Sequence, residues 1–139
     1  MRRRCHKRPA PVRSRVLDTL TDRFRRFDRI VEVGIGHQTE LAAALVEYST
    51  VTATDIADRQ VPADVAFVRD DLTEPDPAVY AGADLVYAIN LPTELHRPLF
   101  DLVTDEPAVG AFTTFGTEGA AVPTEPEDVG GETLYWIPA

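Results

Sequence analysis

Two glycines, Gly34 and Gly36, separate a short apolar run from a run of strong helix formers. Residues 30–31 (IV) precede them, and residues 41–46 (LAAALV) follow them. Alanine and leucine favour helix strongly, whereas glycines in a turn between a strand and a helix usually allow a bound group to approach the backbone closely. The sequence therefore predicts a strand, a tight turn and a helix, with a ligand in contact with the turn.

Apolar strands alternate with helical segments along most of the chain. Strands are expected at residues 29–34, 50–54, 65–69, 83–89, 108–115 and 132–137, the last antiparallel at a sheet edge. Helices are expected at residues 14–28, 38–48 and 92–103, with a helical turn ending at Tyr80, and residues 116–131 are expected to be loop. This order predicts a single doubly wound α/β domain. Its mostly parallel, Rossmann-like sheet would have a strand order near 3-2-1-4-5 and helices on both faces.

Charge is distributed unevenly along the chain. Residues 1–15 hold seven of the 14 Lys and Arg side chains and no acid, which leaves seven basic against 23 acidic side chains, a net of −16, in the remainder. We interpret residues 1–13 as a basic, disordered leader, or as residues upstream of the true start of translation, and residues 14–139 as the folded domain. A strongly acidic domain without lysine is typical of a halophilic protein, because salt screens its self-repulsion. The same charge argues against nucleic-acid binding by the domain, although the leader could contact nucleic acid or an anionic surface.

The single cysteine, Cys5, excludes an intramolecular disulfide and agrees with a reducing, cytoplasmic setting. The longest apolar run, residues 41–46, is far shorter than the ~20 residues of a membrane span. We therefore expect a cytoplasmic protein without membrane contact.

Polar residues or glycines stand at the ends of four predicted strands. Gly34 and Gly36 follow the first strand, Asp55 ends the second, Asp70 and Asp71 end the third, and Asn90 ends the fourth. Because ligands of doubly wound sheets bind beyond the carboxyl ends of the strands, these residues are expected to surround one site. Asp55 follows Gly36 by 19 residues, close to the ~20 at which an acid accepts hydrogen bonds from ribose hydroxyls. A solvated acid or a helix cap is the alternative role for Asp55.

Residues 32–36 (EVGIG) resemble the first motif of class I methyltransferases, whose methyl donor is S-adenosylmethionine. The resemblance implies six ligand-binding residues: Glu32, Gly34, Gly36, Asp55, Asp70 and Asp71. Asp55 would bind the ribose, and Asp70 or Asp71 would lie near the adenine amino group. The motif usually continues with a further glycine, where this chain has His37 and Gln38.

Four segments resemble an archaeal family of Rossmann-like proteins, uncharacterised protein family 0146. They are VEVGIG (31–36), ATDI (53–56), RDDLTEP (69–75) and ADLVYAINLPTEL (83–95), and the resemblance covers residues 14–119. Members carry Arg-Pro-Pro-x-Glu-Leu at the last of these segments, so Pro92, Glu94 and Leu95 match whereas Asn90 and Leu91 depart. The family has no established activity, and the resemblance therefore implies a fold more than a function.

Asn90 and His37 are the candidate catalytic residues. Residues 90–93 (NLPT) resemble the N-P-P-[YF] motif of amino-group methyltransferases, in which the Asn oxygen accepts from the target amine. Thr93 lacks the aromatic ring that stacks on a base there, and a strand end followed by a helix is the alternative interpretation. His37 could act as a base or contact a ligand carboxylate, or it could be a solvent-facing side chain.

A nucleotide-sensing domain without chemistry is the alternative function. Residues 71–75 (DLTEP) resemble a feature of regulatory domains of ion-transport systems, which bind NAD or adenine nucleotides. Thr39 replaces the third glycine of the dinucleotide motif and argues against NAD. His96 is expected on a helix surface, and no metal site is expected because the acids lack a metal-ligand spacing. A methyltransferase of this length would be minimal, and we expect it to dimerise or to recruit an unknown protein partner.

Overall fold

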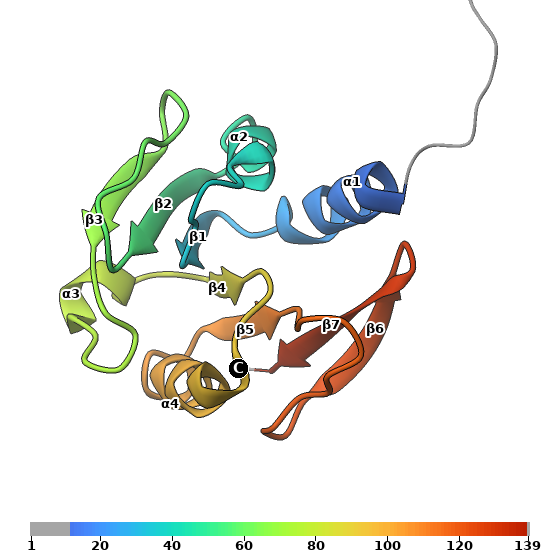
Figure 1. The fold of residues 1–139 in the computed structure, drawn as a ribbon. Helices are drawn as coiled ribbons and strands as arrows, with labels where there is room; N and C mark the ends of the chain where they lie inside the picture. The colour runs from blue at the N-terminus through green and yellow to red at the C-terminus, as the bar shows by residue number, and fades with distance from the viewer. Residues whose placement is uncertain (1–11, 139) are drawn as a thin grey trace, which may run out of the picture.

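The protein forms one seven-stranded sheet with the strand order β3-β2-β1-β4-β5-β7-β6 (Figure 1). The computed structural model describes residues 12–138, with side chains from Arg15 onward. The strands are β1 (Arg29–Val33), β2 (Thr50–Asp55), β3 (Ala66–Arg69), β4 (Leu85–Ala88), β5 (Val109–Phe112), β6 (Glu125–Val129) and β7 (Glu132–Ile137). All pairings among β1 to β5 are parallel, and β7 is antiparallel to both β5 and β6. The predicted order 3-2-1-4-5 is confirmed, with β1 central among these five strands.

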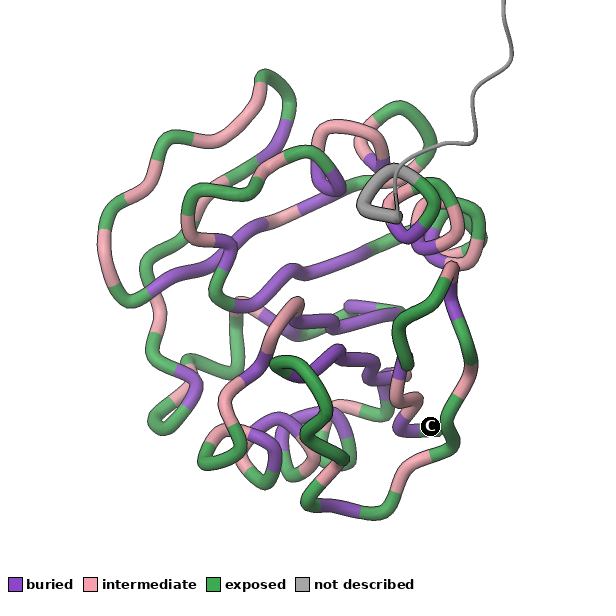
Figure 2. Tube along the Cα trace, turned by 45° about the vertical axis from the view of Figure 1, so that its right-hand side comes forward, coloured by how far each residue is buried: buried purple, intermediate pink, exposed green. Residues whose placement is uncertain are grey.

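Helices cover both faces of the sheet. They are α1 (Val12–Phe24), α2 (Glu40–Leu45), α3 (Pro77–Tyr80) and α4 (His96–Asp105), the last preceded by the 3-10 turn η1 (Thr93–Leu95). Ile30 and Leu85 belong to one core cluster with α1 and α2, whereas Val31 and Val86 belong to a second cluster with α3 and α4. Figure 2 shows the buried residues concentrated along the central strands. Because both faces are covered, β4 is apolar at every position, as is usual in a parallel sheet.

Several predicted boundaries change in the structure: α1 ends at Phe24 rather than at residue 28, and α4 begins at His96 rather than at residue 92. The basic segment 1–13 lies outside the described residues, except that α1 begins at its last two positions. The helix predicted at 38–48 is shorter, because the N–H groups of Tyr48 and Ser49 both donate to the Leu45 carbonyl at 2.9 Å and so end α2. No helix within residues 12–138 is long and apolar enough to cross a membrane.

The segment predicted as loop contains a strand, β6, and this prediction was wrong. Residues 125–128 (EPED) are almost entirely charged and show no apolar alternation, because β6 is the edge of the sheet and faces solvent there. β6 pairs with β7 through a two-residue turn at Gly130 and Gly131, which have φ of +73° and +103°. A Gly-Gly pair of this kind is a hairpin signal. The hairpin also places β7 inside the sheet, where an edge was predicted.

Candidate functional site

The glycine turn leaves open space beside the backbone. Gly34 and Gly36 have φ of +69° and +58°, and the N–H groups of Gly34 and Ile35 donate to the Thr54 carbonyl at 2.9 and 3.1 Å. A Cβ atom at Gly34 would meet nothing within 4 Å, and one at Gly36 would meet only the Gly34 carbonyl oxygen at 4.0 Å. A ligand can therefore lie directly against this turn.

Asp55, at the end of β2, is buried and already has partners within the chain. Its Oδ2 accepts from the Gly36 N–H at 2.9 Å, and its Oδ1 accepts from the Ala57 N–H at 3.1 Å. The Arg59 guanidinium forms an ion pair with it, with Nε 3.3 Å from Oδ2. Burial would raise the pKa of Asp55, but the two backbone hydrogen bonds and the Arg59 cation outweigh it and lower the pKa. Asp55 is therefore ionised and joins the end of β2 to the glycine turn.

Asp70 and Asp71, at the end of β3, are also hydrogen-bonded by the chain. Asp70 accepts from the Tyr80 hydroxyl at 2.7 Å and from the Asp76 N–H at 3.1 Å. Asp71 Oδ1 accepts from the hydroxyl and the N–H of Thr73 at 2.7 and 2.9 Å, and these bonds lower its pKa. Both acids hold the connection from β3 to α3 in place.

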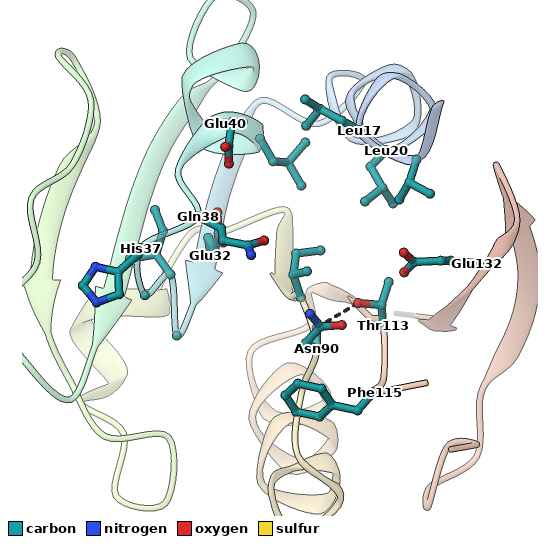
Figure 3. A pocket seen from close by; sticks show the side chains of 16 residues that line it. Leu17, Leu20, Glu32, His37, Gln38, Glu40, Asn90, Thr113, Phe115 and Glu132 are labelled. Carbon is teal, nitrogen blue, oxygen red and sulfur yellow. Dashed lines mark hydrogen bonds between the residues drawn. The ribbon is translucent and has the colours of Figure 1, made fainter. Parts of the chain in front are cut away.

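A cleft of about 640 Å³ opens beside the glycine turn (Figure 3). Its walls come from α1, the turn, the start of α2, the ends of β4 and β5, and the start of β7. The predicted site residues that line it are Glu32, Gly34, Gly36, His37 and Asn90, whereas Asp55, Asp70 and Asp71 do not. Its volume falls in the range of about 300–1,000 Å³ that is usual for small-molecule sites.

Glu32 is a buried acid that lines the cleft. Its side chain projects from β1 on the face covered by α1 and α2, and the residue is only 2% exposed. Oε1 accepts from the Tyr87 hydroxyl at 2.5 Å, and within the described residues Oε2 has no hydrogen-bond partner. Burial, and to a lesser extent the Glu40 carboxylate, raises the pKa of Glu32 to about 8 against the opposing effect of the Tyr87 bond. Glu32 is therefore mostly protonated at neutral pH.

The two candidate catalytic residues lie differently. Asn90 has φ of +54°, and its backbone N–H donates to Thr113 Oγ1 at 2.8 Å, while its side-chain amide has no partner in the described part of the chain. His37 is exposed, and its Nε2 lies 3.1 Å from Arg59 Nη1. Figure 3 shows the His37 ring turned away from the side chains at the centre of the cleft, toward which Gln38 points. The geometry thus brings Asn90, rather than the His37 ring, into the cleft.

His96 is fully buried, so the prediction of a helix-surface residue was wrong. Its Nδ1 accepts from the Ala121 N–H at 3.0 Å, so Nε2 carries the proton and donates to the Leu91 carbonyl at 3.0 Å. Its ring packs on Phe112 with centroids 4.5 Å apart. Helical spacing places His96 on the same stripe as the buried Leu99 and Val103, and that spacing was a usable signal.

Much of the cleft lining was not predicted from the sequence. Thr113 and Phe115 follow β5, Glu132 begins β7, and Leu17 and Leu20 come from α1. The residues after β5 could have been found, because the predicted order places that strand beside β4. The others belong to elements whose place against the sheet is not visible in a linear pattern.

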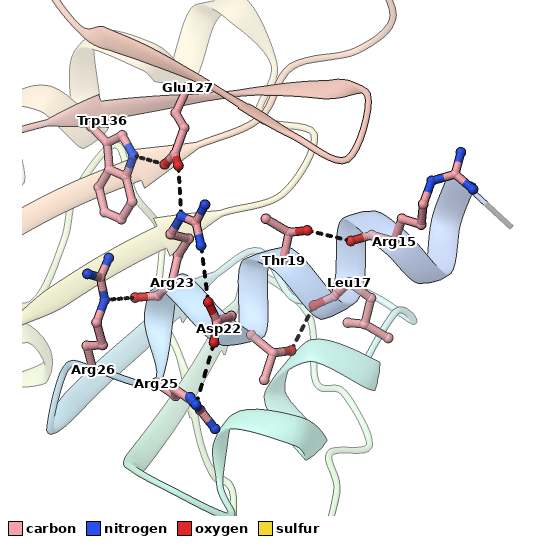
Figure 4. A network of polar contacts seen from close by, with 10 residues as sticks. Arg15, Leu17, Thr19, Asp22, Arg23, Arg25, Arg26, Glu127 and Trp136 are labelled. Atoms are coloured by element: carbon pink, nitrogen blue, oxygen red, sulfur yellow. Dashed lines mark hydrogen bonds and ion pairs between the residues drawn. The ribbon is translucent and has the colours of Figure 1, made fainter. Parts of the chain in front are cut away.

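Contacts between α1 and the β6–β7 hairpin hold these two cleft walls together (Figure 4). Arg23 Nε donates to Glu127 Oε2 at 2.7 Å, and the Trp136 indole N–H donates to Glu127 Oε1 at 3.0 Å. These hydrogen bonds, with the Trp136 bond contributing most, lower the pKa of Glu127. Gly130, at the hairpin tip, lies so close to α1 that a Cβ there would be 3.0 Å from the Val16 nitrogen.

The fold is a Rossmann-like α/β fold, and the solved structures that resemble it include methyltransferases. Residues 17–135 match the model of Uncharacterised protein family (UPF0146), and the chain belongs to that family. A UPF0146 protein of Halobacterium salinarum is 50% identical over 96 residues, which are 68% of this chain and 74% of the relative. A UPF0146 protein of Archaeoglobus fulgidus is 34% identical over 88 residues, which are 63% of this chain and 66% of the relative.

Two solved structures illustrate the likeness. The RNA methyltransferase from Salinibacter ruber, in complex with S-adenosyl-L-homocysteine, has a TM-score of 0.60 at 20% identity and covers 96% of this chain and 94% of its own. The TehB-like SAM-dependent methyltransferase from Corynebacterium glutamicum has a TM-score of 0.61 at 16% identity and covers 87% and 84%. At these identities the likeness establishes the Rossmann-like fold alone.

Proposed function

We propose that this protein binds S-adenosylmethionine across the glycine turn, with the adenosine toward the ends of β2 and β3 and the methionine portion toward the cleft. The observation that carries the proposal is the open space beside Gly34 and Gly36, which adjoins a buried, ionised acid on one side and the cleft on the other. Among residues 12–138 nothing fills this space, which leaves it free for a bound molecule.

The end of β2 suits an adenosine. A carboxylate offers about four lone-pair sites, so Asp55 can accept from ribose hydroxyls in addition to its two backbone N–H groups. Ile56, the next residue, is 66% exposed and offers an apolar surface to the base. Asp71 is the more exposed of the two acids after β3, and we assign it to the adenine amino group.

Charge favours S-adenosylmethionine over NAD. NAD carries an anionic pyrophosphate, which other Rossmann-like proteins place at the N-terminus of the helix after the glycine turn. Here α2 has only six residues and carries Glu40 in its first turn, and Glu132 also lines the cleft. These acids would repel a pyrophosphate, whereas they attract the sulfonium and ammonium of S-adenosylmethionine.

We further propose methyl transfer rather than nucleotide sensing, because the cleft extends past the turn and leaves room for a second molecule. Bound S-adenosylmethionine would supply an electrophilic methyl group, and Asn90 is the residue best placed to contact the acceptor. A homodimer or a protein partner would complete the acceptor site.

A calorimetric titration tests the proposal. The full chain in molar KCl is titrated with S-adenosylmethionine, S-adenosylhomocysteine, NADH and ATP. We expect the two sulfur ligands to bind and NADH to bind at least about tenfold more weakly. Tighter binding of NADH would support the nucleotide-sensing alternative. No binding of any of the four at millimolar concentration would mean that the glycine turn serves the fold alone.

A further inference from the structure

The cleft extends beyond the glycine turn into a region whose ligand class the proposed function leaves open. This region, here called the far cleft, is lined by Leu17, Leu20, Ile89, Asn90, Phe115 and Glu132. It lies between α1, the ends of β4 and β5, and the start of β7 (Figure 3). A second molecule placed here would lie next to the methionine portion of S-adenosylmethionine, so an inference about it rests on the proposed function.

Three of the seven polar side chains that line the cleft are acidic. Glu32, Glu40 and Glu132 come from β1, α2 and β7, and none of the described arginines lines the cleft. Glu132 directs its carboxylate into the space between the walls (Figure 3). The buried Glu32 leaves one oxygen without a hydrogen-bond partner among the described residues. Because its raised pKa keeps Glu32 mostly protonated, the negative charge of the cleft comes from Glu40 and Glu132, and this charge attracts a cationic ligand.

Apart from Asn90 and Glu132, the lining of the far cleft is apolar, with one aromatic ring. Phe115 is 51% exposed, which is unusual for a large apolar side chain, and it follows Thr113, the acceptor of the Asn90 N–H. Leu17, Leu20 and Ile89 face the same space. Such a lining binds an apolar or planar molecule by burying its surface.

Asn90 supplies the directional group. Its backbone is held in the left-handed region at φ +54° by the hydrogen bond to Thr113, a conformation that costs free energy for a residue other than glycine. The amide that this conformation presents has no partner in the described part of the chain. Its oxygen can accept one N–H of a ligand while a carboxylate accepts another.

From this placement we infer that the far cleft binds the methyl acceptor, and that the acceptor is an amine on an aromatic or apolar body. The amine enters protonated and passes one proton to the Glu132 carboxylate. Asn90 Oδ1 accepts a remaining N–H and directs the nitrogen lone pair toward the methyl carbon. The new N–C bond forms as the C–S bond breaks, the C–S electron pair stays on sulfur, and the nitrogen regains a positive charge as a methylated ammonium.

Three probes of nearly one size test the ligand class on the full chain. They are phenethylamine (cationic), 2-phenylethanol (neutral) and phenylacetate (anionic), titrated by ligand-observed NMR with and without S-adenosylhomocysteine. We expect phenethylamine to bind about tenfold more tightly than 2-phenylethanol and phenylacetate to bind least, because a charge-assisted hydrogen bond is worth roughly this factor. Equal affinity for the amine and the alcohol, or preference for the anion, would overturn the inference.

Matched variants locate the site. Glu132→Gln should weaken phenethylamine binding about tenfold and leave 2-phenylethanol unchanged. Glu125→Gln makes the same charge change on the same hairpin outside the cleft and should change neither. Phe115→Ala should weaken both probes, whereas Tyr48→Ala, at another exposed aromatic, should weaken neither. Equal effects of the two glutamate variants would place the amine elsewhere.

One further measurement separates this inference from the proposed function. S-adenosylmethionine is titrated into the same samples, and N-methylphenethylamine is sought by mass spectrometry. If S-adenosylmethionine binds and phenethylamine does not, the acceptor class is wrong and the proposed function stands. If the amine binds at Glu132 but no adenosine ligand binds, the proposed function is wrong and the amine site stands. Methylated product that disappears in Glu132→Gln and persists in Glu125→Gln supports both.

Discussion

The polar side chains on the two sides of the glycine turn differ in how many hydrogen bonds they form within the protein. On the side of β2 and β3, both oxygens of Asp55 and of Asp70 accept hydrogen bonds from neighbouring residues. On the side of β4 and β7, the Asn90 amide and one oxygen of Glu32 have no such partner among the described residues. Acids that stand at similar positions in the sequence, such as Asp55 and Glu32, therefore have different roles on the two sides of the turn.

This difference indicates that the acids after β2 and β3 mainly maintain the geometry of the site, whereas the cleft side mainly recognises the ligand. The acids after β2 and β3 hold the connections in a fixed geometry and can bind a ligand with the lone pairs that remain. On the cleft side, the partly buried Asn90 amide has no partner among the described residues, so it can form a hydrogen bond to a ligand without losing one within the protein. The following predictions test whether the two sides act as this comparison states.

The largest effect is expected at the boundary between the two sides. Gly36→Val fills the open space beside the turn and should weaken S-adenosylmethionine binding about 100-fold or more in a calorimetric titration. Gly82→Val is the control, since Gly82 also has positive φ (+80°) and open surroundings. Gly82 precedes β4, whereas the cleft lies at the carboxyl end of that strand. Both variants should lose similar thermal stability. Equal binding by the two would show that the turn contacts no ligand.

Glu32→Gln tests the buried acid of the cleft side. The pKa of Glu32 is about 8 in the folded protein against an ordinary value of 4.5, so the folded state keeps a proton that the unfolded state loses between these pH values. Ionisation of Glu32 therefore destabilises the fold progressively as pH rises through this window. Glutamine avoids that cost, and the variant should be more stable than the wild type by a few kcal/mol above pH 8. Thermal unfolding from pH 4 to 9 should show the advantage shrinking toward zero at the acid end, and an advantage independent of pH would contradict the assignment.

Asp55→Ala tests the proposed ribose contact on the side of β2 and β3, where the acids already accept hydrogen bonds within the protein. Loss of the ribose acceptor should weaken S-adenosylmethionine binding about tenfold, and Asp55→Asn, which keeps one acceptor, should weaken it less. Asp84→Ala is the matched control, because Asp84 also accepts a backbone N–H, from Arg29 at 2.9 Å, but precedes β4. Calorimetry on the three variants gives the order. Unchanged affinity in Asp55→Ala would leave this acid as a support of the turn only.

The smallest effect is expected from Tyr80→Phe. The change removes the hydroxyl that donates to Asp70 and should lower the free energy of unfolding by about 1 kcal/mol. Binding of S-adenosylmethionine should stay within about twofold, because Asp70 serves the connection from β3 to α3 rather than the ligand. A tenfold loss of binding would mean that the position of Asp70 matters to recognition, and the comparison would then need revision.

The sequence predicted the central fold because the signals there are local. β1, β4 and β5 contain short apolar runs beside a turn or helix, and β2 is rich in β-branched residues, so each carries a local strand pattern. β6 was not predicted because an exposed edge strand of charged residues has no such pattern. Only the glycine pair before β7 indicated a hairpin there. The burial of His96 was not predicted because histidine is a polar residue type, although its helical spacing from Leu99 and Val103 indicated the buried face.

For the candidate site, the chain alone determined which residues stand at the ends of strands, since strand direction and order follow from local pattern. That was enough to bring Glu32, Gly34, Gly36 and Asn90 to one cleft. Tertiary structure decided which acids are already satisfied, because hydrogen-bond partners such as Tyr80 for Asp70 are set by packing. It also decided the far cleft. Leu17 and Glu132 come from opposite ends of the chain, and only the packing of α1 against the β6–β7 hairpin, with its bond between Arg23 and Glu127, brings them to face one cavity.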